Sequence, residues 1–218
     1  MITEKQLKIL STFKQNIFQE YTFKQIKEHS KEKSNSLIQN AIKKFKKEEL
    51  ITEKKIGTSK LYKLNHENDK IYDYLRIINK EQISKKIDSS IKQIQEELDE
   101  INLNYSLIIF GSYANKTNNE KSDLDLAIII SDEKERKNIK IALNSALNKT
   151  IIEIDTHIIT EKEFLEMMKT KYENLVKQII KKNLPIYNTV KFYKLILRGI
   201  NNGFDPIYWE SRKRIRIS

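Results

Sequence analysis

The sequence predicts an α/β (α+β) protein with an N-terminal unit of helices and a hairpin, followed by a domain with a small mixed sheet flanked by helices. Two apolar runs, 108–110 and 124–130, indicate this sheet, because short buried strands have this length and composition. The first run stops at Gly111, and the second follows Asp123. Around these runs apolar residues recur at helical spacing, whereas in 51–64 the period is two, as in a hairpin.

Between the two predicted strands lie the residues with the clearest chemical signal. Only 4 of the 218 residues are glycine, so Gly111, where a strand turns toward a helix, indicates a special backbone conformation. Ser112 is expected to cap that helix. Asp123 and Asp125 are two apart on a strand, so both side chains leave one face and can converge on a hard cation. Each pattern alone is common, and an Asp-x-Asp pair at the start of a strand usually belongs to a solvent-exposed turn.

The spacing Gly-Ser, ten residues, Asp-x-Asp resembles the signature of the DNA polymerase beta-like nucleotidyltransferase superfamily, in particular its minimal nucleotidyltransferase branch. The resemblance spans 108–130 and implies transfer of a nucleoside monophosphate from a nucleoside triphosphate, with ATP expected, to a hydroxyl of a protein, an RNA or a small molecule. It also implies a site for two Mg²⁺ ions completed by a third carboxylate on a neighbouring strand. The implied catalytic and metal-binding residues are Asp123, Asp125 and Asp155. The implied nucleotide-binding residues are Gly111, Ser112, Lys116 and Lys121.

The third carboxylate is expected on a strand within 151–159. Glu153 and Asp155 alternate with isoleucines there, so both acids share one face while the isoleucines enter the core. Asp155 is assigned because its distance from the next helix fits the family better, and Glu153 is held in reserve. His157 lies on the same face, although a histidine in such a place is more often packed or hydrogen-bonded than a ligand.

Composition excludes several classes of protein. The chain has no Cys, which rules out disulfides and thiolate metal sites, and it has no Walker-type lysine loop. No apolar run is long enough to span a bilayer, and the N-terminus lacks the apolar core of a signal peptide, so we expect a cytoplasmic protein with no membrane partner. The net charge of +11 gathers at the two ends, since 1–70 holds 16 Lys and Arg against 9 Asp and Glu. Such an end would attract a polyanion.

The N-terminal part resembles a winged helix-turn-helix domain in its order of elements. Helices are expected at 4–15 after Thr3, at 22–29, and at 37–49, and a hairpin is expected at 51–64 with its turn at 56–59. Apolar residues should face inward from the three helices. They are Leu7, Leu10, Phe13 and Ile17 in the first, Phe23 and Ile26 in the second, and Ile38, Ala41, Ile42 and Phe45 in the third.

The resemblance implies that residues 1–68 bind duplex DNA, with RNA as a further possibility. The third helix would enter a major groove, and the lysines of the hairpin would meet phosphates. Polar groups that can reach bases and phosphates lie on one side of that helix. They are Ser36, Gln39, Asn40, Lys43 and Lys47. The alternative is a module of the same fold that contacts protein or tRNA.

The sequence pattern divides the whole chain into four parts. We assign 1–68 to the winged helix unit, 69–101 to connecting and packing helices, 102–200 to the nucleotidyltransferase domain with its C-terminal helices, and 201–218 to a basic aromatic tail. The isoleucine and leucine stripe of 87–101 repeats by four and three, which allows a coiled-coil homodimer. We favour packing of this stripe against the protein's own sheet.

Further helices are expected at 132–147, at 161–181 after the cap Thr160, and at 187–199, with 183–185 as a break. The tail carries the single Trp and three of the six arginines, so it suits either contacts with bases or an edge strand.

Two functions follow from this pattern. Minimal nucleotidyltransferases often act as antitoxins that attach AMP to a tyrosine of a HEPN-type toxin, and a winged helix would let such an antitoxin bind its own operator. The alternative is a DNA-binding transcriptional regulator whose nucleotidyltransferase fold senses a nucleotide or is inactive.

Overall fold

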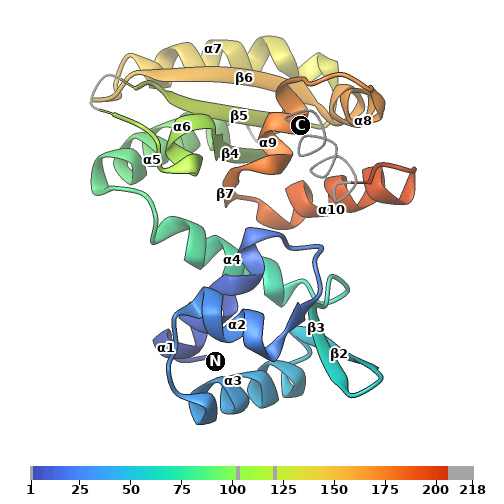
Figure 1. Cartoon of the computed structure of the whole chain (residues 1–218). Helices are drawn as coiled ribbons and strands as arrows, with labels where there is room; N and C mark the ends of the chain where they lie inside the picture. The colour runs from blue at the N-terminus through green and yellow to red at the C-terminus, as the bar shows by residue number, and fades with distance from the viewer. Residues whose placement is uncertain (1, 102–103, 120–121, 206–218) are drawn as a thin grey trace, which may run out of the picture. The chain divides into compact units, whose positions relative to one another are not determined.

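The computed structural model describes residues 2–101, 104–119 and 122–205, and it divides into two compact units, Met1–Glu81 and Gln82–Ser218 (Figure 1). The division falls inside 69–101, the segment expected to hold packing helices. Each unit has its own sheet and its own core, so each is described by itself.

Capping residues precede the first three helices of the N-terminal unit, and the third helix begins at Asn35, two residues before the expected start at 37. Thr3 and Thr22 each form a capping box, with Gln6 and Gln25 respectively, and the Ser34 side chain accepts from the backbone of the third helix. Such caps satisfy amide groups that have no partner within the helix. The helical elements are α1 (Glu4–Leu10), the 3-10 segment η1 (Ser11–Gln15), α2 (Phe23–Ser30), α3 (Asn35–Lys47) and α4 (Lys70–Lys80).

The expected hairpin is confirmed as β2 (Ile51–Ile56) and β3 (Ser59–Leu64), joined at Gly57, which has a φ of +58°. A further strand, β1 (Tyr21–Thr22), pairs with β3, so the sheet order is β1-β3-β2. This strand has only two residues and carries no period of its own, which is why its sequence gives no signal. Three helices followed by a hairpin are the order on which the winged-helix resemblance rests, and that resemblance stays a prediction.

The predicted inward faces of the N-terminal helices form the core of this unit. Every expected inward residue is buried except Phe23, which is half-buried beside a surface groove. The polar side of α3 is exposed as expected. His66, for which the sequence offers no partner, lies 2.9 Å through Nε2 from the carbonyl oxygen of Ile17 and 3.3 Å through Nδ1 from the Tyr72 hydroxyl. Burial lowers the pKa of His66, so the ring favours its neutral form.

The C-terminal unit is built on a mixed sheet, as predicted. Its strands are β4 (Tyr105–Phe110), β5 (Leu124–Ile130), β6 (Ile154–Thr160) and β7 (Asn183–Tyr187), in the order β6-β5-β4-β7. β5 runs antiparallel to β4 and parallel to β6, and β4 runs antiparallel to β7. β4 and β5 are central and almost wholly buried, which explains why they are the clearest apolar runs in the sequence.

One face of this sheet packs on two helices. The helical elements of the unit are α5 (Lys85–Glu100), α6 (Gly111–Asn115), the 3-10 segment η2 (Glu133–Glu135), α7 (Arg136–Leu147), α8 (Glu161–Lys169), α9 (Leu175–Lys181) and α10 (Thr189–Asn201). The apolar stripe of α5 lies in one core cluster with α7 and alternate residues of β4 and β5. The stripe therefore faces the protein's own sheet, which confirms the favoured prediction. A coiled coil along it would have to expose this core.

The segment 161–181 corrects a prediction, because it forms two helices where one was expected. α8 ends before Thr170, and Asn174 caps α9 by accepting from the Lys177 amide at 3.1 Å. Lys177 is 1% exposed, and its ammonium group donates to the carbonyl oxygens of Thr170 and Tyr172. Polar side chains thus satisfy the backbone of the interruption, and helical periodicity in the sequence does not show this.

The expected break at 183–185 is also corrected, because it is the start of strand β7. Pro185 pairs with Ile108 at a register shift in the ladder, and β7 is an edge strand, where a proline is tolerated. The last helix consequently starts at Thr189 and not at Tyr187, which belongs to β7. Every helix in the described part of the chain is too short or too polar to cross a membrane.

We predict that the buried end of β4 depends on the Tyr105 hydroxyl. It donates to Asp99 Oδ1 at 2.7 Å, and its ring stacks on Tyr187 with centroids 4.8 Å apart. Tyr105→Phe should lower the free energy of unfolding by about 1 kcal/mol, because it deletes a charge-assisted hydrogen bond while keeping the ring. The matched change Tyr187→Phe, whose hydroxyl lies at 3.3 Å from the same carboxylate, should cost less. Urea denaturation measures both, and a larger loss for Tyr187→Phe contradicts the assignment.

Candidate functional site

The turn after β4 depends on Gly111. Its φ is +63°, which a residue with a side chain rarely adopts, and a Cβ atom at this position would overlap Oδ2 of Asp125. The special backbone conformation predicted for Gly111 is therefore confirmed. The role predicted for Ser112 is wrong, because Phe110 is the N-cap of α6 and no side chain caps this helix. The Ser112 amide instead donates to Asp125.

The parallel pairing of β5 with β6 brings two carboxylates together. Asp125 is level with Asp155, and Ala127 is level with His157, so all four side chains lie on the same face of the sheet. This is the face opposite the core of α5 and α7, since the flanking residues Leu124 and Leu126 belong to that core. Asp125 is half-buried, whereas Asp155 on the edge strand is 59% exposed. One acid is thus held by the protein and the other is accessible.

The electrostatics of Asp125 favour a cation. Burial raises the pKa of Asp125, and the negative charge of Asp155 raises it further, with a smaller contribution from Asp123. His157 and the Ser112 amide act in the opposite direction. The paired carboxylates of Asp125 and Asp155 repel one another until a cation neutralises them. The ionised form of Asp125 is disfavoured in the folded protein relative to the unfolded chain, so protonation of Asp125 favours folding. At neutral pH the ionised carboxylate therefore lowers the free energy of unfolding.

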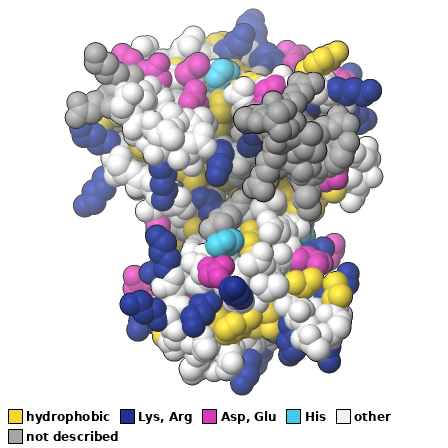
Figure 2. Space-filling model, viewed as in Figure 1, with side chains coloured by type: hydrophobic (Ala, Val, Ile, Leu, Met, Phe, Trp, Pro, Cys, Tyr) yellow, Lys and Arg dark blue, Asp and Glu magenta, His cyan; other side chains and the backbone are white. Residues whose placement is uncertain are grey.

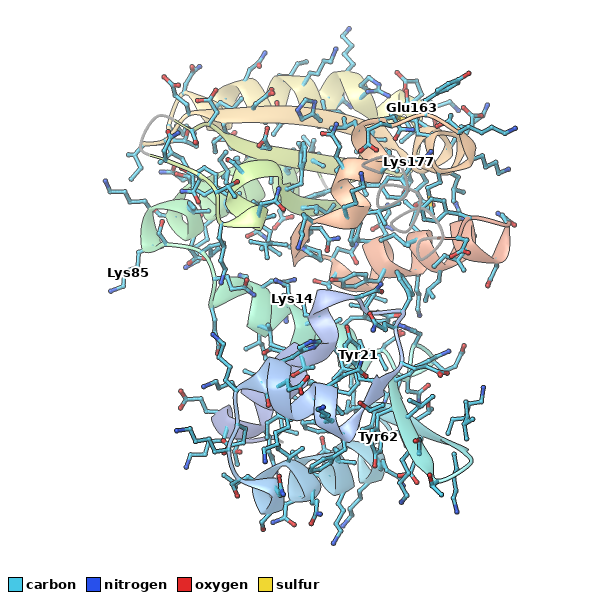
Figure 3. The ribbon with its side chains drawn as sticks, viewed as in Figure 1. Lys14, Tyr21, Tyr62, Lys85, Glu163 and Lys177 are labelled. Carbon is cyan, nitrogen blue, oxygen red and sulfur yellow. The ribbon has the colours of Figure 1, made fainter. Side chains whose placement is uncertain are left out.

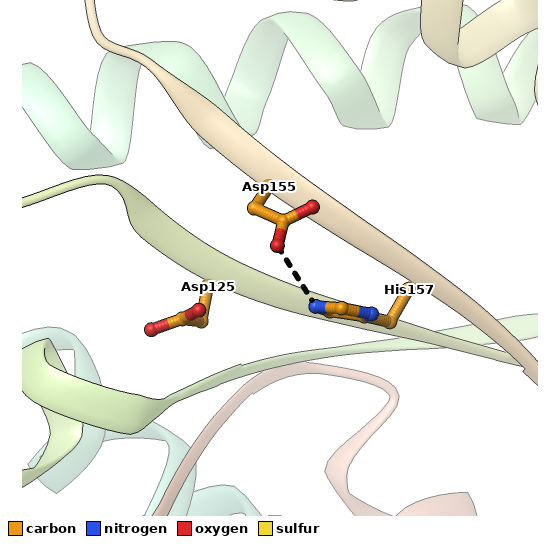
Figure 4. A group of neighbouring side chains, drawn as sticks. All are labelled: Asp125, Asp155 and His157. Carbon is orange, nitrogen blue, oxygen red and sulfur yellow. Dashed lines mark ion pairs between the residues drawn. The ribbon is translucent and has the colours of Figure 1, made fainter. Parts of the chain in front are cut away.

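His157 completes a group of three side chains that can act as ligands (Figure 4). One ligand atom from each of Asp125, Asp155 and His157 lies within 4.8 Å of the others. His157 Nε2 is 3.2 Å from Asp155 Oδ2, and its ring lies beside Phe110 with centroids 5.5 Å apart. Carboxylate oxygens and an imidazole nitrogen are donors for a divalent metal ion, so these residues fit such an ion.

Arg136, which the sequence did not point to, supports β6 where it leaves the site. Its guanidinium donates to the carbonyl oxygen of Ile158 at 2.6 Å and to Glu163 at 2.6 Å. Glu163 is labelled in Figure 3. Glu163 also accepts from the Thr160 amide in the capping box of α8. The capping box Thr160-x-x-Glu163 was the available signal, but only the fold shows that an arginine from α7 joins it.

The other predicted site residues lie apart from this group. Asp123 is exposed directly before β5 and lies outside the group of three. Glu153 is exposed directly before β6, and its carbonyl oxygen accepts from Leu124. Lys116 is exposed at the C-cap of α6, with a φ of +58°. Lys121 lies outside the described residues, as does most of the predicted tail. The structure therefore brings together Gly111, Ser112, Asp125 and Asp155.

The N-terminal unit has a separate feature, a groove of about 620 Å³. The residues around it come from α2, α3 and the hairpin, and they include Phe23, Ile42 and Tyr62 together with Lys24, Gln39, Lys43, Lys46, Thr58, Ser59 and Lys60. Glu53 is the acid in this lining, and it binds Lys46 at 2.7 Å and Lys60 at 3.2 Å. The hydrogen bonds from Lys46 and Lys60 lower the pKa of Glu53. The groove thus combines apolar walls with a basic rim.

A comparison with protein families accounts for the C-terminal site. Residues 91–187 match the family described as "Nucleotidyltransferase domain". The match begins inside α5 and ends with β7, so it includes Gly111, Ser112, Asp125 and Asp155. A comparison with the curated proteins gives no match. The family implies use of a divalent metal, which agrees with the donors found around Asp125. The match of residues 91–187 therefore supports a place in the nucleotidyltransferase superfamily for this part of the chain, and nucleotidyl transfer as its function.

Proposed function

We propose that this protein is a metal-dependent enzyme that transfers a nucleoside monophosphate from a nucleoside triphosphate, with ATP expected, to a hydroxyl group. The observation that carries the proposal is the convergence of Asp125 and Asp155 on one face of the sheet, next to the tight turn at Gly111. The match of this segment to the nucleotidyltransferase domain family supports the same conclusion.

The reaction has a simple balance. The acceptor oxygen forms a bond to the α-phosphorus of the triphosphate, the bond from that phosphorus to the bridging oxygen breaks, and pyrophosphate leaves. Asp155 takes the proton of the acceptor hydroxyl, since it is the more accessible of the paired carboxylates. The residues that would hold two Mg²⁺ ions are Asp123, Asp125 and Asp155. Bound there, the metal would neutralise phosphate charge and acidify the hydroxyl.

The turn at Gly111 and Ser112 would hold the triphosphate, as the family resemblance implies. Its backbone comes close to Asp125, so phosphate oxygens bound there would lie near the paired carboxylates. Lys116 and Lys121 are proposed to offset charge on the leaving pyrophosphate. The acceptor would be a protein such as a HEPN-type toxin, an RNA end or a small molecule. Incubation with each labelled triphosphate, Mg²⁺ and each acceptor class, followed by detection of the labelled product, tests the proposal.

We predict that Asp125→Asn abolishes transfer without destabilising the protein. The pKa of Asp125 is raised above its ordinary value, so its ionised form is disfavoured in the folded state and its loss removes repulsion. At pH 7 the free energy of unfolding should stay equal or rise relative to the wild type. The difference should shrink as the pH falls below about 4, where the wild-type carboxyl is protonated in the folded and unfolded states. Urea denaturation at several pH values measures this.

The control for this change is Asp73→Asn, which removes an exposed carboxylate on a helix of the other unit. It should leave transfer unchanged. Transfer by Asp125→Asn within tenfold of the wild type would contradict the proposed function, and a marked loss of stability would contradict the electrostatic account of the site.

We predict that the two acids of the β6 region differ in their effect on the rate. Asp155→Asn should lower the transfer rate by about a hundredfold or more, because it removes a metal donor that is also the proposed base. Glu153→Gln should cost much less, since Glu153 lies before the strand and outside the group around Asp125. Single-turnover rates separate them. The reverse order would show that Glu153 is the third acid.

A second function is supported by the groove of the N-terminal unit. We propose that this unit binds nucleic acid, with duplex DNA expected and RNA as the alternative. The basic rim offers charges to phosphates, and the side of α3 that carries Gln39 and Lys43 borders the groove. Lys and Arg side chains are spread over the face of this unit seen in Figure 2. A DNA-binding transcriptional regulator would also require this binding activity.

We predict that Lys43→Ala in the full chain weakens binding to every duplex sequence and flattens the dependence of log affinity on log salt by about one unit, if Lys43 neutralises one phosphate. Lys137→Ala, an exposed lysine of α7, is the matched control and should change neither. Fluorescence anisotropy across a salt series measures both. Binding of structured RNA at least tenfold better than any duplex would replace the DNA proposal with an RNA one.

A further inference from the structure

His157 has no part in the mechanism proposed above, yet it lies in the group of side chains best placed to hold an ion. The three ligand atoms that gather within 4.8 Å are two carboxylate oxygens and one imidazole nitrogen, from Asp125, Asp155 and His157. Asp123, the third donor expected from the sequence, is outside this group. The donor set in this arrangement is thus mixed, with nitrogen and oxygen.

We propose that His157 is a metal ligand, and that it gives this site a preference for a divalent first-row transition ion over Mg²⁺. The inference rests on the proposed function only in assuming that one divalent ion lies between Asp125 and Asp155. It concerns the chemical class of the cofactor and not the reaction that the cofactor assists.

The distances suit one shared ion. Metal bonds to imidazole nitrogen and carboxylate oxygen are about 2.0–2.2 Å long, so two neighbouring ligands of one ion are about 3 Å apart and two opposite ligands about 4 Å. His157 Nε2 and Asp155 Oδ2 are 3.2 Å apart, a neighbouring pair, and the ligand atoms of all three side chains lie within 4.8 Å of one another. The same nitrogen that faces Asp155 would therefore face the ion.

Neighbouring residues hold His157 toward the site. Its ring packs beside Phe110, the residue before the Gly111 turn, and Ala127 on β5 is level with it. The next residue of β6, Ile158, is held through its carbonyl by Arg136. The side chain of His157 is 32% exposed, so an ion can reach it from solvent. These contacts reduce the conformational entropy that the His157 side chain would lose on binding an ion.

The nitrogen donor decides which ion is favoured. Mg²⁺ prefers oxygen ligands and keeps much of its water, whereas Co²⁺ and Zn²⁺ bind imidazole well. A carboxylate as the third donor would favour Mg²⁺. The alternative is that His157 only forms an ion pair with Asp155 and orients that carboxylate, in which case its removal would affect all divalent ions alike.

The experiment measures metal affinity in the full chain without nucleotide. Titration calorimetry with CoCl₂ and with MgCl₂ is carried out on the wild type, on His157→Ala, and on His29→Ala, a matched change of an exposed histidine in the other unit. We expect His157→Ala to weaken Co²⁺ binding about tenfold or more while Mg²⁺ affinity changes less than about threefold. His29→Ala should behave as the wild type. An unchanged ratio of the two affinities in His157→Ala overturns the proposal.

A spectroscopic readout tests ligation directly. The chain has 3 histidines, so their ring nitrogen signals can be assigned by substitution in an NMR spectrum of ¹⁵N-labelled protein. One equivalent of ZnCl₂ should shift the Nε2 signal of His157 and leave those of His29 and His66 in place. A spectrum in which the His157 signal stays at its metal-free position overturns the proposal.

The two proposals can fail separately. If the wild type transfers nucleotide with Mg²⁺ but His157→Ala keeps the ratio of metal affinities, the inference about His157 fails and the proposed function stands. If Co²⁺ binding depends on His157 but no triphosphate is consumed with any acceptor class, the inference stands and the proposed function fails.

Discussion

The site depends on one close approach, between the backbone at Gly111 and the carboxylate of Asp125. A positive φ lets the chain leave β4 and enter α6 within one residue, and the missing side chain leaves room for Asp125 Oδ2. The Ser112 amide then donates to this carboxylate. An acid that is half-buried and held by backbone cannot turn away from its neighbours. This explains why a turn that requires glycine and an acidic strand lie next to each other.

The rest of the C-terminal unit supports that approach through the sheet. Alternate residues of β4 and β5 enter the core with α5 and α7, which fixes the opposite face as the place for Asp125. The parallel register then sets Asp155 and His157 beside Asp125 and Ala127. A shift of one residue in this register would move both donors of β6 to the other face. The burial of the core is therefore what keeps the polar residues together.

Interactions between residues close in the sequence predicted much of this structure. The features that were not predicted depend on contacts between residues distant in the sequence. Caps such as Thr3 and Thr160 mark helix starts because the bonds lie within one turn of chain. The strand β7 contains Pro185, and its place at the sheet edge depends on pairing with β4, which is distant in sequence. The interruption of 161–181 depends on buried Lys177. Likewise Gly111 could be chosen from its position, whereas the group of Asp155 with His157 required the strand register.

The two units differ in the sign of the charge that they present. The N-terminal part has a surplus of basic residues, and in its groove the single negative charge of Glu53 is shared by Lys46 and Lys60, so the rim keeps a positive surplus that can meet phosphates. The C-terminal site instead presents carboxylates, and burial together with the negative charge of Asp155 raises the pKa of Asp125. A bare polyanion would be attracted to the first and repelled by the second. Under the proposed function, a phosphate ligand would therefore enter the C-terminal site together with a cation that neutralises the carboxylates, and the metal would then be a condition of substrate binding as well as of chemistry.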